Sequence, residues 1–391
     1  MPNRNRTNQA QDERRRSPLW AKVSLALGIV LVVLSGSTFV VAKVAESKVN
    51  DAIPDHRLAG PAGVAVKHAE IKGAKNILLA SLDTRPSWSE THEASHTDSI
   101  IILHVAADHS LAYMLSIPRD TLVEIPKYDN GKYQNAEHKD KINSAFAYGS
   151  MGLDGDAAIT HGMTLLTETV QKQFGITPDA EAVINYAGFT QIVQLLGKVC
   201  MYVDENVTSI HVGHTADGQR AVPYKTNNAG IIQYHIAGVT PNKYSIGNHC
   251  FTPTEALDYA RQRDLLSKKD GDYGRQRHQQ QLLKATLKTA VSEGLNSPTK
   301  LPGLLTAIGK AMTVFQQGIS LEDWAFGLKD IKPDNIITLR TNDGKFDPVD
   351  APAGVGSAEG LTPDSLAMFQ AAKDDTMEEF VRAHPTWVAN N

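Results

Sequence analysis

Charged residues stand at the ends of apolar runs in the first part of this 391-residue chain. Three such runs cover residues 76–82, 99–105 and 111–117. Each is predicted to be a buried strand that is apolar on both faces. Asp83 follows the first run, Asp98 precedes the second, and Arg119 follows the third, with Asp120 directly after it. If consecutive strands pair antiparallel, these strand ends lie at one edge of the sheet. We therefore expect carboxylates and an arginine to converge there.

This set of residues suits phosphate chemistry assisted by a cation. A carboxylate pair such as Asp83 and Asp98 is typical of a site for the hard cation Mg²⁺. The planar fork of an adjacent arginine binds phosphate oxygens held against that cation. Two other interpretations stay open at this point. Each charge can be a solvated loop residue or part of a surface ion pair, or His92 and His96 can bind zinc together with Asp98.

A second group of candidate phosphate-binding residues occupies segments 259–263 and 271–279. Arg275 and Gln279 are four residues apart, so they share one face of a helix predicted from about residue 275 to 293. The N-terminus of a helix favours a bound anion. Arg261 and Arg263 precede this helix, and the alternative for them is that they cap the C-terminus of another helix.

Helices and strands alternate along the rest of the chain. Amphipathic spacing predicts helices over residues 156–174, ending at Gly175, and over residues 186–196. A strand is predicted over 199–203, and Thr252 begins a further helix, with proline next and glutamate three residues after the cap. This alternation predicts an α/β domain, although the strand order cannot be read from the sequence.

The N-terminal part contains a segment long enough to cross a membrane. Residues 23–42 are apolar and uncharged, and as a helix they match a hydrocarbon core of about 30 Å. A cleaved secretory signal, the alternative, has a shorter apolar region and a cleavage site after it. Basic residues are concentrated before the segment, which favours a cytoplasmic N-terminus. We expect a single-pass plasma-membrane protein with an extracytoplasmic catalytic domain.

These patterns divide the chain into five parts. The predicted organisation is a disordered cytoplasmic tail, a transmembrane helix, an extracytoplasmic linker, a catalytic domain and a C-terminal extension, at residues 1–18, 19–42, 43–74, 75–345 and 346–391. The two cysteines, Cys200 and Cys250, allow one disulfide in an oxidising compartment, with two buried thiols as the alternative. A net charge of −4 without a basic stripe argues against a nucleic-acid partner.

Taken in order, the short motifs resemble the LytR–CpsA–Psr family from about residue 75 to residue 293. The motifs that carry the resemblance are Asn76-Ile77-Leu78-Leu79 with Asp83 and Arg85, Thr97-Asp98-Ser99, Ile117-Pro118-Arg119-Asp120, Lys141-Ile142-Asn143, Asp258-Tyr259-Ala260-Arg261-Gln262-Arg263, and Gly271-Asp272-Tyr273-Gly274-Arg275 with Gln279-Gln280-Gln281. Each motif alone is weak, but their order along one chain is specific.

The resemblance implies an α/β/α fold, with a central mixed β-sheet flanked by helices and a hydrophobic tunnel for a polyprenyl lipid. It also implies a magnesium-dependent phosphotransferase of cell wall biogenesis. Such an enzyme moves a teichoic-acid-like, arabinogalactan-like or capsular glycopolymer from a polyprenyl-pyrophosphate donor to the peptidoglycan acceptor.

The family pattern assigns three kinds of site residue. The expected catalytic residues are Arg119, Asp120, Arg261 and Asp272. The expected substrate-binding residues are Arg85, Lys141, Asn143, Arg263, Arg275 and Gln279. The expected ligands of Mg²⁺ are Asp83 and Asp98.

This chain departs from the family pattern at two positions, because His96 and His278 stand where the family often has arginine. Both are expected to donate to phosphate when protonated and to weaken the charge clamp near neutral pH. Two other functions remain open. One is a pyrophosphatase that uses water as the acceptor. The other is a non-enzymatic regulator, or transcriptional attenuator, although an outward-facing domain cannot reach DNA and the tail is too short for a reader domain.

Overall fold

The structure is a computed structural model that describes residues 71–82, 95–227, 230–290, 292, 306, 308–320, 323–324, 327–328 and 331–389. The predicted tail, the predicted transmembrane helix and most of the predicted linker lie outside these residues. Within the part that is described, no helix is both long enough and apolar enough to cross a membrane.

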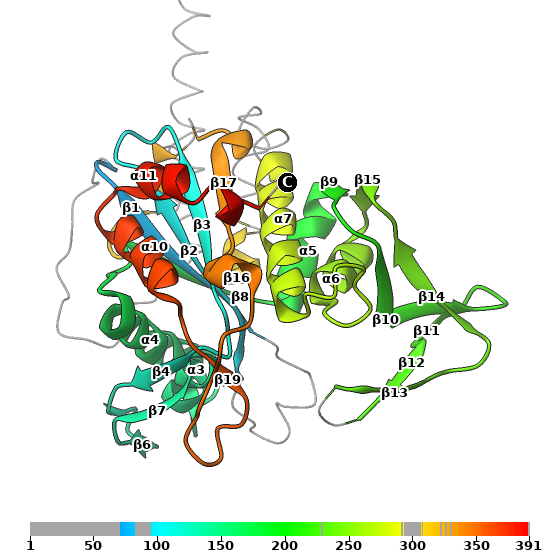
Figure 1. The fold of residues 1–391 in the computed structure, drawn as a ribbon, viewed down its shortest axis with the longest axis horizontal. Helices are drawn as coiled ribbons and strands as arrows, with labels where there is room; N and C mark the ends of the chain where they lie inside the picture. The colour runs from blue at the N-terminus through cyan, green and yellow to red at the C-terminus, as the bar shows by residue number, and fades with distance from the viewer. Residues whose placement is uncertain are drawn as a thin grey trace, which may run out of the picture. The chain divides into compact units, whose positions relative to one another are not determined.

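A six-stranded mixed sheet forms the centre of the domain (Figure 1). Its strands, in spatial order, are β16 (Met312–Phe315), β8 (Ala180–Asn185), β1 (Lys75–Leu82), β2 (Thr97–Val105), β3 (Ala112–Ile117) and β17 (Ile336–Leu339). The predicted antiparallel meander β1-β2-β3 is confirmed. Parallel pairs join β1 to β8 and β3 to β17. The three meander strands are apolar on both sides because helices cover both faces of the sheet.

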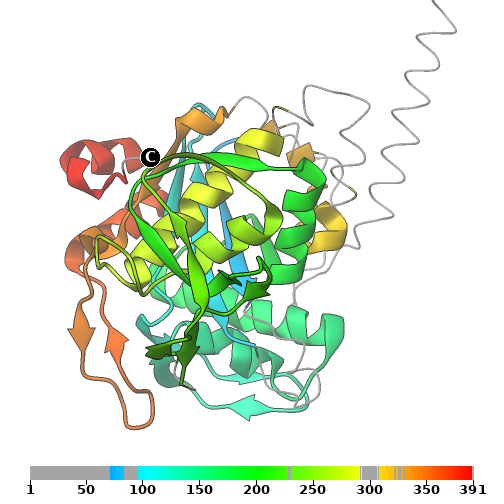
Figure 2. The ribbon, with the colours of Figure 1, turned by 90° about the vertical axis from the view of Figure 1, so that its right-hand side faces the viewer.

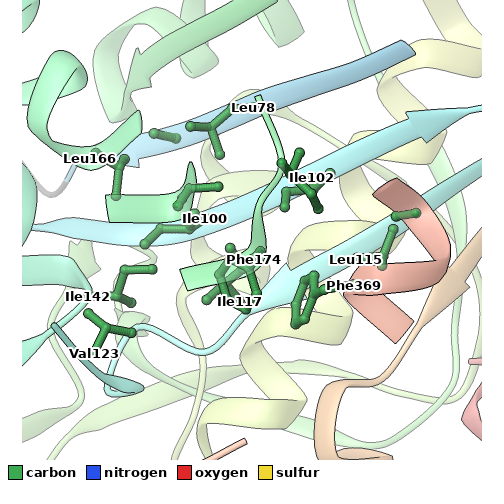
Figure 3. Packing of buried hydrophobic residues seen from close by; sticks show 14 of the residues in the cluster. Leu78, Ile100, Ile102, Leu115, Ile117, Val123, Ile142, Leu166, Phe174 and Phe369 are labelled. Atoms are coloured by element: carbon green, nitrogen blue, oxygen red, sulfur yellow. The ribbon is translucent and has the colours of Figure 1, made fainter. Parts of the chain in front are cut away.

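One face of the sheet packs against α4 (Gly155–Phe174), with α3 (Asn143–Ser150) beside it (Figure 3). Alternate strand residues such as Leu78 and Ile100 meet Leu166 of α4 in this core. The helix ends as predicted at Gly175, whose φ of +65° suits glycine and whose N–H donates to the carbonyl of Gln171 at 2.8 Å.

The C-terminal residues pack into this same core. The ring of Phe369 in α10 (Pro363–Lys373) lies tilted against that of Phe174, with 4.2 Å between their centroids, and Phe380 of α11 (Met377–Ala383) belongs to the same buried cluster. The segment beyond the predicted boundary at 345 and 346 therefore shares the core of the preceding α/β domain.

The opposite face of the sheet is covered by α5 (Tyr186–Leu196) and α7 (Asp272–Ala290), and α6 (Pro253–Arg261) packs against both helices. Successive strand residues point to opposite faces of the sheet, so Ile101 and Met114 face this side, together with Leu283 of α7. Thr252 forms the predicted capping box with Glu255. The helix α7 starts at Asp272, three residues earlier than predicted, and the N–H of Arg275 already bonds to the carbonyl of Gly271 at 3.2 Å.

A second core lies between these helices and a layer of short strands, which faces the viewer in Figure 2. The strands of this region are β9 (Val199–Val203), β10 (Val207–Thr215), β11 (Arg220–Ala221), β12 (Tyr224–Thr226), β13 (Ile232–His235), β14 (Val239–Tyr244) and β15 (Gly247–Phe251). Cys200 of β9 and Cys250 of β15 stand directly opposite each other and form a disulfide.

Three two-stranded pieces complete the described strands. They pair β4 (Leu122–Ile125) with β7 (His138–Lys141), β5 (Tyr128–Asp129) with β6 (Gln134–Asn135), and β18 (Pro348–Val349) with β19 (Ala358–Glu359). The first pair follows β3 directly and ends at Lys141, beside the sheet edge where the candidate residues converge.

Removing the disulfide should destabilise the domain. The cysteines are 50 residues apart, so the chain-entropy model gives an upper limit of about 4 kcal/mol for replacing both Cys200 and Cys250 with serine. Both side chains are exposed, and serine fits there without a cavity. Denaturant unfolding of the double variant under non-reducing conditions measures the loss. Two titratable thiols in the unfolded, unreduced wild type would contradict the disulfide.

Candidate active site

The strand register brings the predicted strand ends to one edge of the sheet. Leu82 at the end of β1 pairs with Thr97 at the start of β2, and Ile100 of β2 pairs with Ile117 at the end of β3. Asp98 and Arg119 therefore lie within contact distance, as the meander predicted. Asp83 and Arg85 lie outside the described residues, so the pairing of Asp83 with Asp98 and the phosphate-binding role of Arg85 stay predictions.

Asp98 is buried, with 8% of its surface exposed, and three side chains hold its carboxylate. Arg119 Nη1 donates to Oδ1 at 2.8 Å, Arg275 Nη1 lies 3.4 Å from the same oxygen, and the Tyr186 hydroxyl donates to Oδ2 at 2.6 Å. Burial opposes ionisation, but Arg275, Tyr186 and Arg119 together hold the pKa of Asp98 below its ordinary value. Asp98 is therefore an anion at neutral pH.

Two further aspartates complete the group. Asp120 Oδ1 lies 3.1 Å from Lys141 Nζ, and Asp272 Oδ1 lies 2.8 Å from Arg275 Nη2. Arg119 lies between these carboxylates, with its Nε 3.6 Å from Asp120 and 3.8 Å from Asp272. We refer to this cluster as the charged centre, and its members are Asp98, Arg119, Asp120, Lys141, Asp272 and Arg275.

Tyr186 is a site residue that the sequence reasoning missed. It is the first residue of α5, where the side chain of Asn185 caps the helix by accepting from the Gly188 N–H at 2.8 Å. Its hydroxyl bonds to Asp98, and its ring lies 4.7 Å from the guanidinium carbon of Arg261. Tyr186 thus connects Arg261, at the end of α6, to the charged centre. A tyrosine at a helix start was visible in the sequence, but its proximity to Asp98 was not.

Glu359 is a second residue that the sequence did not indicate. It lies in β19, and its backbone N–H donates to the carbonyl of Asp120 at 3.0 Å. Its carboxylate accepts the hydroxyl of Tyr273 at 2.5 Å. Burial, and then the charges of Asp272 and Asp120, raise the pKa of Glu359 to about 7. A carboxyl group that titrates near neutral pH therefore adjoins the charged centre.

The remaining predicted substrate-binding residues have other surroundings. The backbone N–H of Asn143 donates to the carbonyl of Arg119 at 3.2 Å and so helps to place that residue. Gln279 lies one turn after Arg275, and its buried Oε1 has no hydrogen-bond partner among the described residues. Arg263 Nε is 3.8 Å from Asp264 and Nη2 lies against Gly230, and both of these contacts are outside the charged centre.

The two histidines behave differently from each other. Burial lowers the pKa of His96, and the charge of the nearby Arg119 lowers it further, so His96 stays neutral beside the site. The expectation that His278 faces phosphate is wrong. His278 is fully buried, its Nε2 lies 3.1 Å from Glu205, and its ring packs on Tyr259 in the second core.

His278 belongs to a group of side chains whose types commonly bind metal ions. Oxygen and nitrogen atoms of Asp204, Glu205 and His278 lie within 4.8 Å of one another. The guanidinium of Arg277 already fills this place, because its Nε lies 3.0 Å from Asp204 and it also pairs with Glu205 and Asp270. A buried arginine must be paired in this way, so this group is a structural ion-pair network that fixes α7.

These observations define the class of protein. It is an α/β domain with a mixed sheet and a cluster of arginines and aspartates at one sheet edge. The LytR_cpsA_psr family model matches residues 37–347. The chain therefore belongs to the LytR–CpsA–Psr family.

Named relatives come from several bacteria. The chain is 30% identical over 237 residues to the polyisoprenyl-teichoic acid–peptidoglycan teichoic acid transferase TagU of Halalkalibacterium halodurans, covering 61% of this chain and 59% of TagU. It is 27% identical over 235 residues to Bacillus subtilis TagT, a transferase of the same description, covering 56% of this chain and 66% of TagT. It is also 29% identical over 248 residues to the regulatory protein MsrR of Staphylococcus aureus, covering 61% of this chain and 58% of MsrR. The chain thus spans less than two thirds of the length of these relatives.

Two solved structures show the same fold. The protein gbs0355 from Streptococcus agalactiae superimposes with a TM-score of 0.54 at 21% identity, covering 78% of this chain and 88% of that one. B. subtilis TagV superimposes with a TM-score of 0.52 at 18% identity, covering 79% of this chain and 98% of TagV.

The stability of the domain should depend on pH through Glu359. Because the fold raises its pKa from about 4.5 to about 7, stability that is fully present below pH 4.5 is lost as pH rises from there through 7. Glu359→Gln mimics the protonated form, so the variant should match the wild type near pH 4 and exceed its free energy of unfolding by up to about 3 kcal/mol near pH 8. Urea unfolding at both pH values measures this, and an equal difference at both would refute it.

Proposed function

We propose that this chain is a membrane-anchored, extracytoplasmic enzyme that moves a glycopolymer from a polyprenyl-pyrophosphate carrier to peptidoglycan during cell wall assembly. The observation that carries the proposal is the charged centre, where the cations Arg119, Lys141 and Arg275 gather at one sheet edge. Membership of the family and the names of the transferases TagU and TagT support the same reaction. The uncharged segment 23–42 with its basic flank supports the anchor and the orientation.

The charged centre suits a pyrophosphate. Arg119 and Arg275 offer planar forks, Lys141 adds a point charge, and Arg261 is held nearby on Tyr186. Phosphoryl transfer depends mainly on positioning and on neutralising the phosphate charge, which is what these cations supply. Arg85 and Arg263 stay predicted additional contacts.

In the proposed reaction, a peptidoglycan hydroxyl attacks the phosphorus that carries the glycopolymer. A new phosphodiester bond forms, the bond between the two phosphates breaks, and polyprenyl phosphate leaves. The hydroxyl proton passes to a carboxylate, for which Asp120 and Asp272 are the candidates because both flank Arg119. Each of them also orients a cation, so either can serve the reaction indirectly.

Asp98 has the properties of a ligand for Mg²⁺. It is ionised, Arg119 and Arg275 contact its Oδ1, and Tyr186 is the one side chain among the described residues that donates to Oδ2, an oxygen with two lone pairs. We propose that Asp83 and Asp98 hold the ion. When bound there, Mg²⁺ would neutralise pyrophosphate charge.

Apolar residues offer a place for the lipid. Leu79 and Leu103 of the sheet, with Leu283 and Leu287 of α7, are only partly buried where the sheet and α7 meet. Leu283 lies about two turns along α7 from Arg275. We propose that the polyprenyl chain packs along these residues in a hydrophobic tunnel, with its pyrophosphate at the charged centre.

Arg119→Lys tests the catalytic role of the fork. Lysine keeps the charge but loses the planar donor set, so turnover should fall by about 10²-fold or more, while the KM for the lipid donor changes much less. The assay uses the full chain in detergent with a labelled donor and purified peptidoglycan. Arg382→Lys, on an exposed arginine of α11, is the matched control.

Product analysis in the same assay separates the candidate reactions. Label on peptidoglycan supports transfer, whereas release of the glycan phosphate into water indicates a pyrophosphatase. Near-normal turnover of Arg119→Lys with a lower melting temperature would mean that Arg119 only stabilises the turn after β3.

The metal proposal predicts that Asp83→Asn and Asp98→Asn each abolish magnesium-dependent turnover, because both ligands serve one ion. The double variant should be no worse than either single variant. Binding of Mn²⁺, followed by electron paramagnetic resonance, should be lost in each variant without any turnover being needed. Additive effects of the two substitutions, or retained Mn²⁺ binding in both, would show that they do not share a metal.

A further inference from the structure

A cavity of about 460 Å³ lies between α5, α6 and the strands β10 and β11. Thr190 of α5 lines it, as do Thr254, Leu257 and Arg261 of α6 and Arg220 of β11. The volume is within the range of pockets that bind small molecules. None of the residues that the sequence analysis assigned to the site, apart from Arg261, belongs to this cavity.

The cavity adjoins the charged centre. Arg261 lines the cavity and also lies over the ring of Tyr186, whose hydroxyl bonds to Asp98. Thr190 lies one helical turn after Tyr186, and its hydroxyl donates to the Tyr186 carbonyl at 2.8 Å. A molecule whose phosphate occupies the charged centre could therefore extend past Arg261 into the cavity.

The cavity carries an excess of positive charge. Arg220 and Arg261 are opposed by one carboxylate, Asp258, which is buried and already accepts from Ser209 at 2.8 Å and Tyr244 at 2.6 Å. A bound anion would thus meet two arginines, with the oxygens of Asp258 turned to their own donors.

The other lining groups suit a sugar. The hydroxyls of Thr190 and Thr254 offer hydrogen-bond partners, while Leu257 and Val212 offer apolar surface for the C–H faces of a pyranose ring. Charge, hydroxyl groups and apolar surface together match a saccharide that bears a phosphate or a carboxylate.

We propose that this cavity is a glycan subsite that binds an acidic saccharide unit of a transferase substrate, an assignment that rests on the proposed function. The unit can come from the donor, as a sugar phosphate, or from the acceptor, as the carboxylate of a muramic acid unit that carries no stem peptide. Both present an anion to Arg220 and Arg261 and hydroxyl groups to the threonines. The two sources are separated by experiment.

The first experiment measures binding without turnover. The full chain in detergent is titrated calorimetrically with N-acetylglucosamine 1-phosphate, with the disaccharide N-acetylglucosaminyl-N-acetylmuramic acid, and with neutral diacetylchitobiose. We expect at least one acidic probe to bind more tightly than the neutral one. Arg220→Ala should weaken that binding by about tenfold or more, as expected for loss of a charged hydrogen bond, and Arg220→Lys should weaken it less.

Lys225→Ala is the matched control, because Lys225 is an exposed cation on the neighbouring strand β12 and does not line the cavity. Arg220 is itself exposed, so its replacement should leave the melting temperature unchanged. Equal binding of acidic and neutral probes by the wild type would overturn the proposal. So would an effect of Arg220→Ala no larger than that of Lys225→Ala.

The second experiment identifies the source of the saccharide. In the transfer assay, Arg220→Ala should raise one KM by about tenfold with kcat largely kept. A raised KM for the lipid-linked donor assigns the cavity to the donor, and a raised KM for peptidoglycan assigns it to the acceptor. If the wild type catalyses no transfer but still binds an acidic probe in an Arg220-dependent way, the proposed function fails and the subsite stands.

Discussion

The burial of one ionised carboxylate, Asp98, organises the whole sheet edge. A buried charge is tolerated only when it is paired and hydrogen-bonded, so its partners must come from whatever elements surround it. Those partners are Arg119 after β3, Arg275 of α7 and Tyr186 of α5. One side chain therefore holds three separate elements in register with β2. The cations brought together in this way are the ones that the proposed reaction requires.

The helix α7 connects the two cores because its arginines alternate in direction. Residues two apart on a helix point to nearly opposite sides, so Arg275 enters the charged centre while Arg277 enters the second core. There Asp204, together with Glu205 and Asp270, pairs with Arg277. The strands around the disulfide thus help to fix the helix that carries Arg275, although they contribute nothing directly to the charged centre.

The proposed binding regions follow one another in a chemical order. Partly buried leucines lie between the sheet and α7, the charged centre lies at the sheet edge, and the cavity with Arg220 lies beyond Arg261. A polyprenyl-pyrophosphate glycan has the same order of apolar, anionic and hydroxyl-rich parts. The carboxyl group of Glu359, which titrates near pH 7, places a pH-sensitive group beside the middle of this series.

Much of the secondary structure and part of the site follow from local patterns in the sequence. The meander, the end of α4 at Gly175 and the capping box at Thr252 depend on neighbouring residues alone, and the meander in turn brings Asp98 to Arg119. Only the tertiary structure decided that His278 faces the second core, and that Tyr186 and Glu359 adjoin the charged centre. These contacts depend on how helices and the C-terminal segment pack against the sheet. Packing joins residues that are far apart in the chain, so no local spacing records it.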